Sequence, residues 1–397
     1  MDVFKNITIL SLEQATVLPY LTYRLAMDGC RVIRLEHPIY GDPNRLVGEP
    51  AIPGEERMNS YFMAINAGKE AMTLNLGDQR GCEILARLIR ELNVDIFATN
   101  QLPRNYKKLG IDYDTLRAVK PDLIWLGITG FGPESNEVAY DPILQARGGL
   151  MELTGEADGS PQVVGIPLPD MGTSEHCYGL LMKALFVRSV TGQGSCLHMS
   201  MFESTTSWLT VPITMTRTFA KNISRRGNTH EFFAPVSVYP TSDGYVYIAV
   251  GNDKQWAAFS SLPEFSALSQ EKYTRNAGRI ADVNTINEVI SDSTRKMTTQ
   301  TLTDKMSSIG VAASKIQTIA EVADDPLVAQ KLLTARDEKS GIELTLAPPP
   351  HSTAFLEAKQ RRLSFPPRFG EHNGAILGQE LGMPAKELEI LKAEGII

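Results

Sequence analysis

The fold is decided by residues 7–38, which read ITILSLEQATVLPYLTYRLAMDGCRVIRLEHP. A short apolar strand is predicted over residues 7–12, and a helix follows over residues 19–27 and stops at Gly29. A second strand is predicted over residues 30–35. Because strand, helix, glycine stop and strand follow one another within about 30 residues, the segment predicts a βαβ unit with parallel strands.

The same alternation continues along the first third of the chain. Strands are predicted over residues 72–76, 94–98 and 123–128, and helices over residues 80–92 and 113–119. Such alternation is typical of an α/β fold with a doubly wound, Rossmann-like sheet, where ligands bind beyond the carboxyl ends of the strands. The residues that stand at these ends are Thr16, His37, Asn100, Gln101 and the turn over residues 129–132.

Composition and motifs exclude several classes of function. The 397 residues carry a net charge of −7 and no cluster of five basic residues, which argues against a nucleic-acid partner. No apolar run approaches the ~18 residues of a membrane span, no signal peptide is recognised, and the four cysteines form no C-x-x-C pair. Neither G-x-G-x-x-G nor a P-loop occurs. We therefore expect a cytoplasmic protein without metal, NAD or Walker-type ATP binding, and with no membrane contact.

After residue 225 the alternation of strands and helices gives way to a predicted hairpin. Residues 234–250 predict two strands joined at Ser242-Asp243-Gly244, which is a strong hairpin signal. A small α+β domain is predicted over residues 226–325, after a large domain over residues 1–225. The turn-rich segment over residues 326–397 is expected to wrap back over the large domain.

One acidic side chain stands at a predicted strand-to-helix turn. Residues 163–174 read VVGIPLPDMGTS, in which a β-branched run reaches two prolines and a helical pattern begins at Ser174. Asp170 would face the unpaired N–H groups and the positive dipole end of that helix, which favours the ionised form. Asp170 is therefore a candidate nucleophile, although it or Ser174 could instead simply cap the helix.

Several separated strings together resemble the class III CoA-transferases, also called the CaiB/BaiF family, which includes formyl-CoA transferase and carnitine CoA-transferase. The resemblance covers nearly the whole chain. Its strings include Gly41-Asp42-Pro43-Asn44-Arg45, Asn66-Ala67-Gly68-Lys69, Tyr140-Asp141-Pro142, the hairpin at residues 239–245 and the tail over residues 391–397.

The resemblance implies that Asp170 is the catalytic nucleophile. Its carboxylate would attack an acyl-CoA thioester to form a mixed anhydride, the CoA thiolate would return to give an aspartyl-CoA thioester, and an acceptor acid would then take over the CoA. Backbone N–H groups around Gly148, Gly149 and Met171-Gly172 are the expected oxyanion donors. The residues that the resemblance implies for CoA contacts are Thr16, His37, Asn66, Gly68, Lys69, Asn100, Gln101, Leu102, Lys108, Thr129 and Gly130.

The resemblance also implies an architecture. It implies a large domain built from both chain ends, an inserted small domain, and a homodimer of interlocked ring-like subunits. The sequence does not identify the donor or the acceptor acid, and small dicarboxylic or hydroxy acids, with succinyl-CoA or acetyl-CoA as donor, are guesses at the pair. The formyl/oxalate pair is not supported, because the glycine-rich loop of formyl-CoA transferase has no counterpart after Arg226.

Two other functions are weighed against CoA transfer. A 2-methylacyl-CoA racemase shares the fold and moves a proton with an acid/base pair. Racemases carry a histidine before the aspartate at the position of Asp141, where this chain has Tyr140. The second alternative is a protein that binds CoA without catalysis, since a fold does not by itself fix a function.

Overall fold

The structure is a computed structural model that describes residues 4–397. The chain forms two compact units. The large unit holds the described residues up to Gly149, together with Val164–Phe219 and Leu327–Ile397, and the small unit holds Leu150–Val163 and Ala220–Pro326. The second segment of the small unit begins at Ala220, six residues before the predicted boundary at residue 226. The small unit also includes Leu150–Val163, which the sequence predicts to belong to the large domain.

The large unit is built on six parallel strands in the order β3-β2-β1-β4-β5-β6. This is the strand order of a doubly wound sheet, in which the direction of winding reverses between β1 and β4. The strands are β1 Thr8–Leu12, β2 Arg31–Glu36, β3 Glu70–Thr73, β4 Ile96–Thr99, β5 Ile124–Thr129 and β6 Ser195–Ser200.

Alternating side chains of the strands serve two separate cores, because successive residues of a strand point to opposite faces. Ile9 and Val32 pack with Leu21 and Leu181 of the helices α1 (Val17–Met27) and α7 (Leu168–Thr191). Leu10 and its neighbours on the other face pack against α3 (Gln79–Glu91) and α4 (Tyr113–Val119). The predicted mixed α/β fold with a parallel sheet is confirmed.

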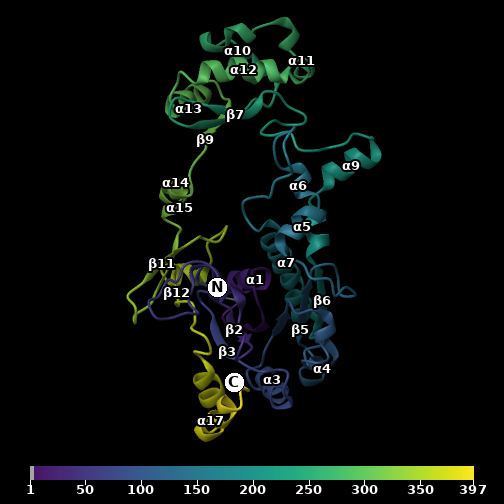
Figure 1. The fold of residues 1–397 in the computed structure, drawn as a ribbon, viewed down its shortest axis with the longest axis vertical. Helices are drawn as coiled ribbons and strands as arrows, with labels where there is room; N and C mark the ends of the chain where they lie inside the picture. Colours follow the sequence, from purple (N-terminus) through teal and green to yellow (C-terminus); the bar gives the residue numbers. More distant parts are fainter. Residues whose placement is uncertain (1–3) are drawn as a thin grey trace. The chain divides into compact units, whose positions relative to one another are not determined.

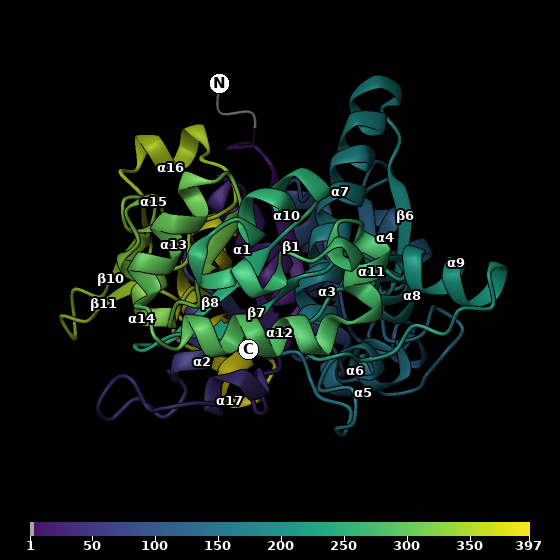
Figure 2. The same ribbon diagram turned by 90° about the horizontal axis from the view of Figure 1, so that it is seen from above.

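The C-terminal segment packs on the large unit in two places, in the core beside α3 and in a separate cluster against α1. The C-terminal helix α17 lies beside α3 (Figure 1), where Leu391 joins the core. Leu333 and Ala335 of β10 contact Tyr23 and Met27 of α1, and Figure 2 shows α1 between the β10–β11 pair and α7. The elements of this segment are β10 Leu333–Arg336, β11 Glu343–Leu346, α16 Ala354–Ala358, β12 Arg362–Leu363, a π-helical turn Gly374–Glu380 and α17 Ala385–Ala393.

The small unit contains the predicted hairpin. β7 (Val236–Pro240) pairs antiparallel with β8 (Tyr245–Ala249), and β9 (Ala312–Lys315) extends the sheet. Its α-helices are α6 Leu150–Leu153, α10 Asp253–Ser260, α11 Asn276–Ala281, α12 Val283–Thr294, α13 Thr299–Ser308 and α14 Ile319–Asp324, and α15, Pro326–Ala329, spans the boundary.

Four short helices complete the large unit: α2 Ser60–Ala64, α5 Asp141–Arg147, α8 Met201–Ser207 and α9 Thr210–Thr218. Across residues 4–397, no helix is both long and apolar enough to cross a membrane. The cytoplasmic location stays a prediction.

A cluster of buried charged side chains packs against the β1–α1 connection. Lys69 Nζ donates to Glu13 Oε1 at 2.9 Å, to Asn66 Oδ1 at 2.8 Å and to the carbonyl oxygen of Pro19 at 2.8 Å. Arg34 Nη2 lies 2.7 Å from Asp42 Oδ2. Glu36 and Arg45 extend this cluster, and the side chains of all six charged residues are almost completely buried.

Breaking the Lys69–Glu13 pair should therefore be costly. Lys69→Met leaves Glu13 with Arg34, 3.8 Å away, as its remaining cation. We expect a loss of about 3–5 kcal/mol in the free energy of unfolding, because removing one partner leaves a buried charge uncompensated. Urea denaturation followed by circular dichroism measures this, and Glu13→Gln/Lys69→Met should recover part of the loss. A Lys69→Met protein as stable as the wild type would contradict the cluster.

Candidate active site

Asp170 lies in the first turn of α7, but the helix begins earlier than the sequence predicts. α7 starts at Leu168 instead of Ser174, and Pro169 lies in its first turn. Proline is well tolerated there, since its missing N–H would have had no helical acceptor. The β-branched run before it pairs with no strand. The two prolines therefore begin the helix instead of ending a strand.

A second carboxylate stands beside Asp170. The backbone N–H of Asp170 donates to Oδ2 of Asp141 at 3.2 Å. Asp141 is the first residue of α5, and its Oδ1 accepts from Gln145 Nε2 at 2.6 Å. Two helices of the large unit thus start at the same place, each with an aspartate in its first turn.

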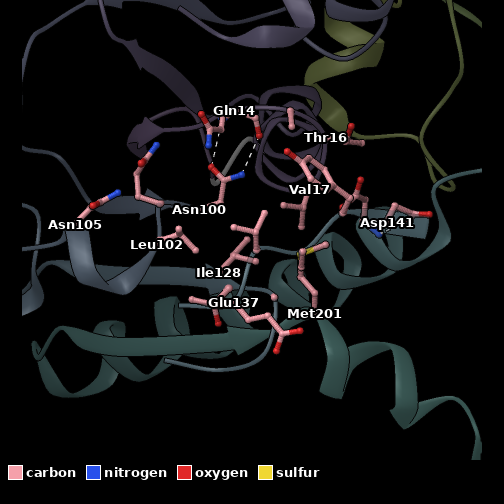
Figure 3. Close-up of a pocket in the computed structure, with 18 residues that line it drawn as sticks. Gln14, Thr16, Val17, Asn100, Leu102, Asn105, Ile128, Glu137, Asp141 and Met201 are labelled. Carbon is pink, nitrogen blue, oxygen red and sulfur yellow. Dashed lines mark hydrogen bonds between the residues drawn. The ribbon is translucent and has the colours of Figure 1, made fainter. Parts of the chain in front are cut away.

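These aspartates lie in a pocket of about 350 Å³ within the large unit (Figure 3). The pocket opens at the carboxyl ends of β1, β4 and β5, where winding of the sheet reverses and ligands commonly bind. Its lining residues are Gln14, Ala15, Thr16, Val17, Asn100, Gln101, Leu102, Asn105, Ile128, Thr129, Gly130, Glu137, Val138, Ala139, Tyr140, Asp141, Asp170 and Met201.

The pocket makes Asp170 a stronger base than an exposed aspartate. Burial raises the pKa of Asp170 to about 7, and the negative charge of Asp141 adds to the shift. Burial also raises the pKa of Asp141, although the hydrogen bond from Gln145 opposes this. Burial and the charge of Asp141 both oppose the predicted preference of Asp170 for its ionised form.

Six of the predicted CoA-contact residues line the pocket with Asp170. They are Thr16, Asn100, Gln101, Leu102, Thr129 and Gly130. The amide of Asn100 is engaged with the chain itself: its Nδ2 donates to the carbonyl oxygen of Gln14 at 2.9 Å, and its Oδ1 accepts from the N–H of Gln14 at 3.2 Å (dashed lines in Figure 3).

Two further predicted residues, His37 and Lys108, line a second pocket of about 250 Å³. This pocket shares Gln101 and Asn105 with the first one, so the two pockets are neighbours. Burial lowers the pKa of His37, which favours its neutral form. The remaining lining residues are Gly77 and four leucines: Leu12, Leu74, Leu76 and Leu109.

The remaining three predicted CoA-contact residues, Asn66, Gly68 and Lys69, lie outside both pockets. Lys69 and Asn66 are buried in the charged cluster described above, where three acceptors surround the Lys69 ammonium group. Gly68 has φ +81° and donates its N–H to the carbonyl oxygen of Ser364. Neither pocket is lined by any of the three.

The backbone N–H groups that the sequence analysis expects as oxyanion donors already have acceptors within the chain. The N–H groups of Gly148, Gly149 and Met171 donate to the carbonyl oxygens of Leu144, Ala146 and Pro167. The start of α1 offers an alternative, because Thr16 forms no side-chain cap and helix geometry leaves the N–H of Val17 without an intrahelical acceptor. Val17 lines the pocket.

Sequence reasoning missed several lining residues, among them Gln14, Asn105, Glu137 and Met201. Tyr140 and Asp141 enter the sequence analysis through a family string and through the racemase comparison, but not as site residues of this chain. A further signal was present, since Pro142 follows Asp141, and proline in a first turn marks a helix start. In the part of the chain that the structure describes, no group of three His, Cys, Asp or Glu is arranged to hold a metal ion.

Comparison with known proteins identifies the class. The model of CoA-transferase family III matches residues 4–373, and the chain therefore belongs to this family of enzymes. The predicted family is confirmed.

Several characterised proteins resemble the chain over most of its length. Succinate–glutarate CoA-transferase of Agrobacterium fabrum is 29% identical over 382 residues, covering 94% of each chain. Succinyl-CoA:mesaconate CoA-transferase of Haloarcula marismortui is 30% identical over 360 residues, covering 88% of this chain and 90% of the relative. A crystal structure of a CaiB/BaiF family protein from Brucella suis superposes with a TM-score of 0.81 at 29% identity, covering 94% of this chain and 98% of that one.

The raised pKa of Asp170 predicts the pH dependence of activity. If Asp170 is the nucleophile it must be ionised, and kcat/KM for the acyl-CoA should then fall as the pH drops through about 7 and level off above it. Asp141→Asn removes the neighbouring charge and should move the midpoint to lower pH. Initial rates measured across the pH range test this.

Glu137→Gln is the matched control for that series. Glu137 lines the same pocket and is paired with Arg147 at 2.9 Å, but it is not among the groups that raise the pKa of Asp170. Its midpoint should stay at the wild-type value. An Asp141→Asn profile that coincides with the wild-type profile would contradict the assignment.

Proposed function

We propose that this enzyme transfers CoA from an acyl-CoA donor to a small carboxylic acid through covalent adducts of Asp170. The observation that carries the proposal is the position of Asp170, a carboxylate with a raised pKa in a pocket that shares lining residues with a second one, in a chain of CoA-transferase family III. Two neighbouring pockets suit a long substrate whose reacting end lies at Asp170.

The proposed reaction balances within the donor, the acceptor and Asp170. A carboxylate oxygen of Asp170 attacks the thioester carbon, the C–S bond breaks, and a mixed anhydride and CoA thiolate form. The thiolate attacks the aspartyl carbon of the anhydride, which releases the donor acid and leaves an aspartyl-CoA thioester. The acceptor carboxylate attacks this thioester, and the freed thiolate then takes the acceptor acyl group and restores Asp170. These reaction steps require neither a metal ion nor NAD.

Each tetrahedral intermediate places a negative charge on an oxygen beside Asp170. In our proposal the N–H of Val17, at the positive end of α1, donates to this oxygen, because the first-turn donors of α7 are already occupied or absent. Asp141 acts differently, since its Oδ2 holds the N–H of Asp170 and so fixes the start of α7.

The CoA moiety would extend from Asp170 into the second pocket. The pantetheine arm is proposed to pass between Thr16, Gln101 and Gly130, which line the first pocket. The nucleotide end would occupy the second pocket, where Lys108 is exposed and offers its ammonium group to the phosphates. Neutral His37 would contribute a hydrogen bond.

The relatives suggest the substrate class. Their names state succinate with glutarate and succinyl-CoA with mesaconate, all of them small dicarboxylic acids or their CoA esters. We therefore propose succinyl-CoA as donor and a small dicarboxylic acid as acceptor.

We also propose that the enzyme is an interlocked homodimer, as its family resemblance implies. Large apolar side chains on the large unit support this, since Phe186 and Val190 of α7 are each 70% exposed and Phe219 is 65% exposed. Sedimentation equilibrium should give twice the chain mass. A monomer at micromolar concentration would contradict the assembly.

Asp170→Ala should abolish transfer of CoA from succinyl-CoA to any acid in a screen of mono- and dicarboxylic acids read by mass spectrometry. CoA binding should persist, because the substitution removes only the attacking group. Hydroxylamine should trap the wild-type enzyme as a hydroxamate on the peptide that contains Asp170. Asp170→Asn is the matched control for size and should be equally inactive.

Other outcomes would assign the alternatives. An Asp170→Ala enzyme that transfers CoA at the wild-type rate would refute the mechanism. Deuterium uptake at C2 of an acyl-CoA without an acceptor acid would indicate a racemase. CoA binding without transfer between any pair would indicate a binding protein.

A further inference from the structure

The loop between β1 and α1 forms one wall of the active pocket in an unusual backbone conformation. Gln14, Ala15 and Thr16 all line the pocket. Ala15 has φ +62°, in the left-handed region that residues other than glycine rarely adopt. Such a conformation persists only where the surroundings hold it.

Two side chains from another loop hold the backbone of Ala15. The N–H of Ala15 donates to Asp42 Oδ1 at 3.1 Å, and Asn44 Nδ2 donates to the carbonyl oxygen of Ala15 at 2.7 Å. Asp42 and Asn44 are themselves buried. Both hydrogen-bonding groups of Ala15 are therefore occupied on the side away from the pocket.

Asp42 is in turn fixed by the charged cluster. Its Oδ2 accepts from Arg34 Nη2 at 2.7 Å, and its own N–H donates to Glu36 Oε2 at 3.0 Å. Asp42 Oδ1 also accepts from the N–H of Asn44 at 2.9 Å. The orientation of the Asp42 side chain is thus set by a buried ionic contact outside the pocket, and Asp42 in turn holds the backbone of Asn44.

The clamped loop is connected to the helix that carries Asp170. Ser174 Oγ lies 2.5 Å from the carbonyl oxygen of Val17 and 2.9 Å from that of Asp170. The first turn of α1, directly after the loop, is therefore tied to the first turn of α7. A shift of the loop would move the pocket wall relative to the nucleophile.

We propose that Asp42 and Asn44 are positioning residues of the active pocket. They hold Ala15 in its left-handed conformation, and this fixes Thr16 and Val17 against the bound acyl-CoA. The inference rests on the proposed function, since the molecule to be positioned is an acyl-CoA. It also gives a role to the string Gly41-Asp42-Pro43-Asn44-Arg45, which contributes no residue to either pocket.

The alanine variant of Asn44 tests the proposal. Without the Asn44 amide, Ala15 can relax to an ordinary conformation. We expect kcat/KM for the acyl-CoA to fall about 10- to 100-fold, since small misplacements of a positioned substrate have effects of this size. The Kd for CoA measured by calorimetry should rise. Asn44→Asp keeps the side-chain size but cannot donate to the carbonyl oxygen of Ala15, and it should show the same losses.

A glycine at residue 15 separates backbone positioning from simple loss of structure. Glycine adopts φ +62° without strain. Ala15→Gly/Asn44→Ala should therefore recover part of the kcat/KM lost in Asn44→Ala, and an absence of recovery would overturn the backbone mechanism.

Asn373→Ala is the matched control for a lost side-chain clamp. Asn373 is half-buried and binds the N–H of Thr73 at 2.9 Å and its hydroxyl at 2.8 Å, far along the sheet from Asp170. It should change thermal stability and leave kcat/KM at the wild-type value. Asn44→Ala with wild-type kcat/KM and wild-type Kd for CoA would overturn the proposal.

The two proposals fail in different ways. If the wild-type enzyme binds CoA but transfers it between no pair of acids, the proposed function is wrong. The CoA affinities of the wild type and of Asn44→Ala then still decide whether the loop positions the ligand.

Discussion

The energetics of the site depend on removing one carboxylate from water. In water, Asp170 would be a weak base and a poor nucleophile. Its pocket raises the pKa to about 7 through burial and through the charge of Asp141, so its carboxylate is far more basic than that of a free aspartate. The same helix that exposes Asp170 to the pocket buries Leu181 and Cys177 in the core, which keeps the carboxylate from moving out toward solvent.

The buried charged cluster also fixes one wall of the pocket, because its member Asp42 binds the backbone of Ala15. In a parallel sheet the carboxyl ends of β1 and β4 lie at the same edge, but the sheet does not determine the path of the loop that follows β1. Asn100 holds Gln14 from the β4 side, while Asp42 and Asn44 hold Ala15 from the β2 side. The wall is therefore rigid because its own backbone groups are bonded outward, which leaves its inner surface to the ligand.

Patterns in the sequence predicted those features that depend on local periodicity or on a family string. The βαβ unit, the hairpin of the small unit and the place of Asp170 at a helix start belong to this group. Local patterns do not show which side chains the fold buries. Lys69 stands in a string that the family resemblance assigns to CoA contacts, and the fold surrounds its ammonium group with acceptors from Glu13, Asn66 and Pro19. The early start of α7 was missed because its prolines can either stop a strand or begin a helix.

The charges that line the pocket bear on the order of the proposed steps. Its charged lining residues are Glu137, Asp141 and Asp170, all acidic. A free acceptor acid would meet the negative charge of ionised Asp170, whereas the reacting thioester of an acyl-CoA is neutral. Once Asp170 carries CoA as a thioester, that side chain is neutral and its repulsion of the acceptor carboxylate disappears. The electrostatics thus favour entry of the acceptor after the covalent step, which is the sequence that a two-stage transfer requires.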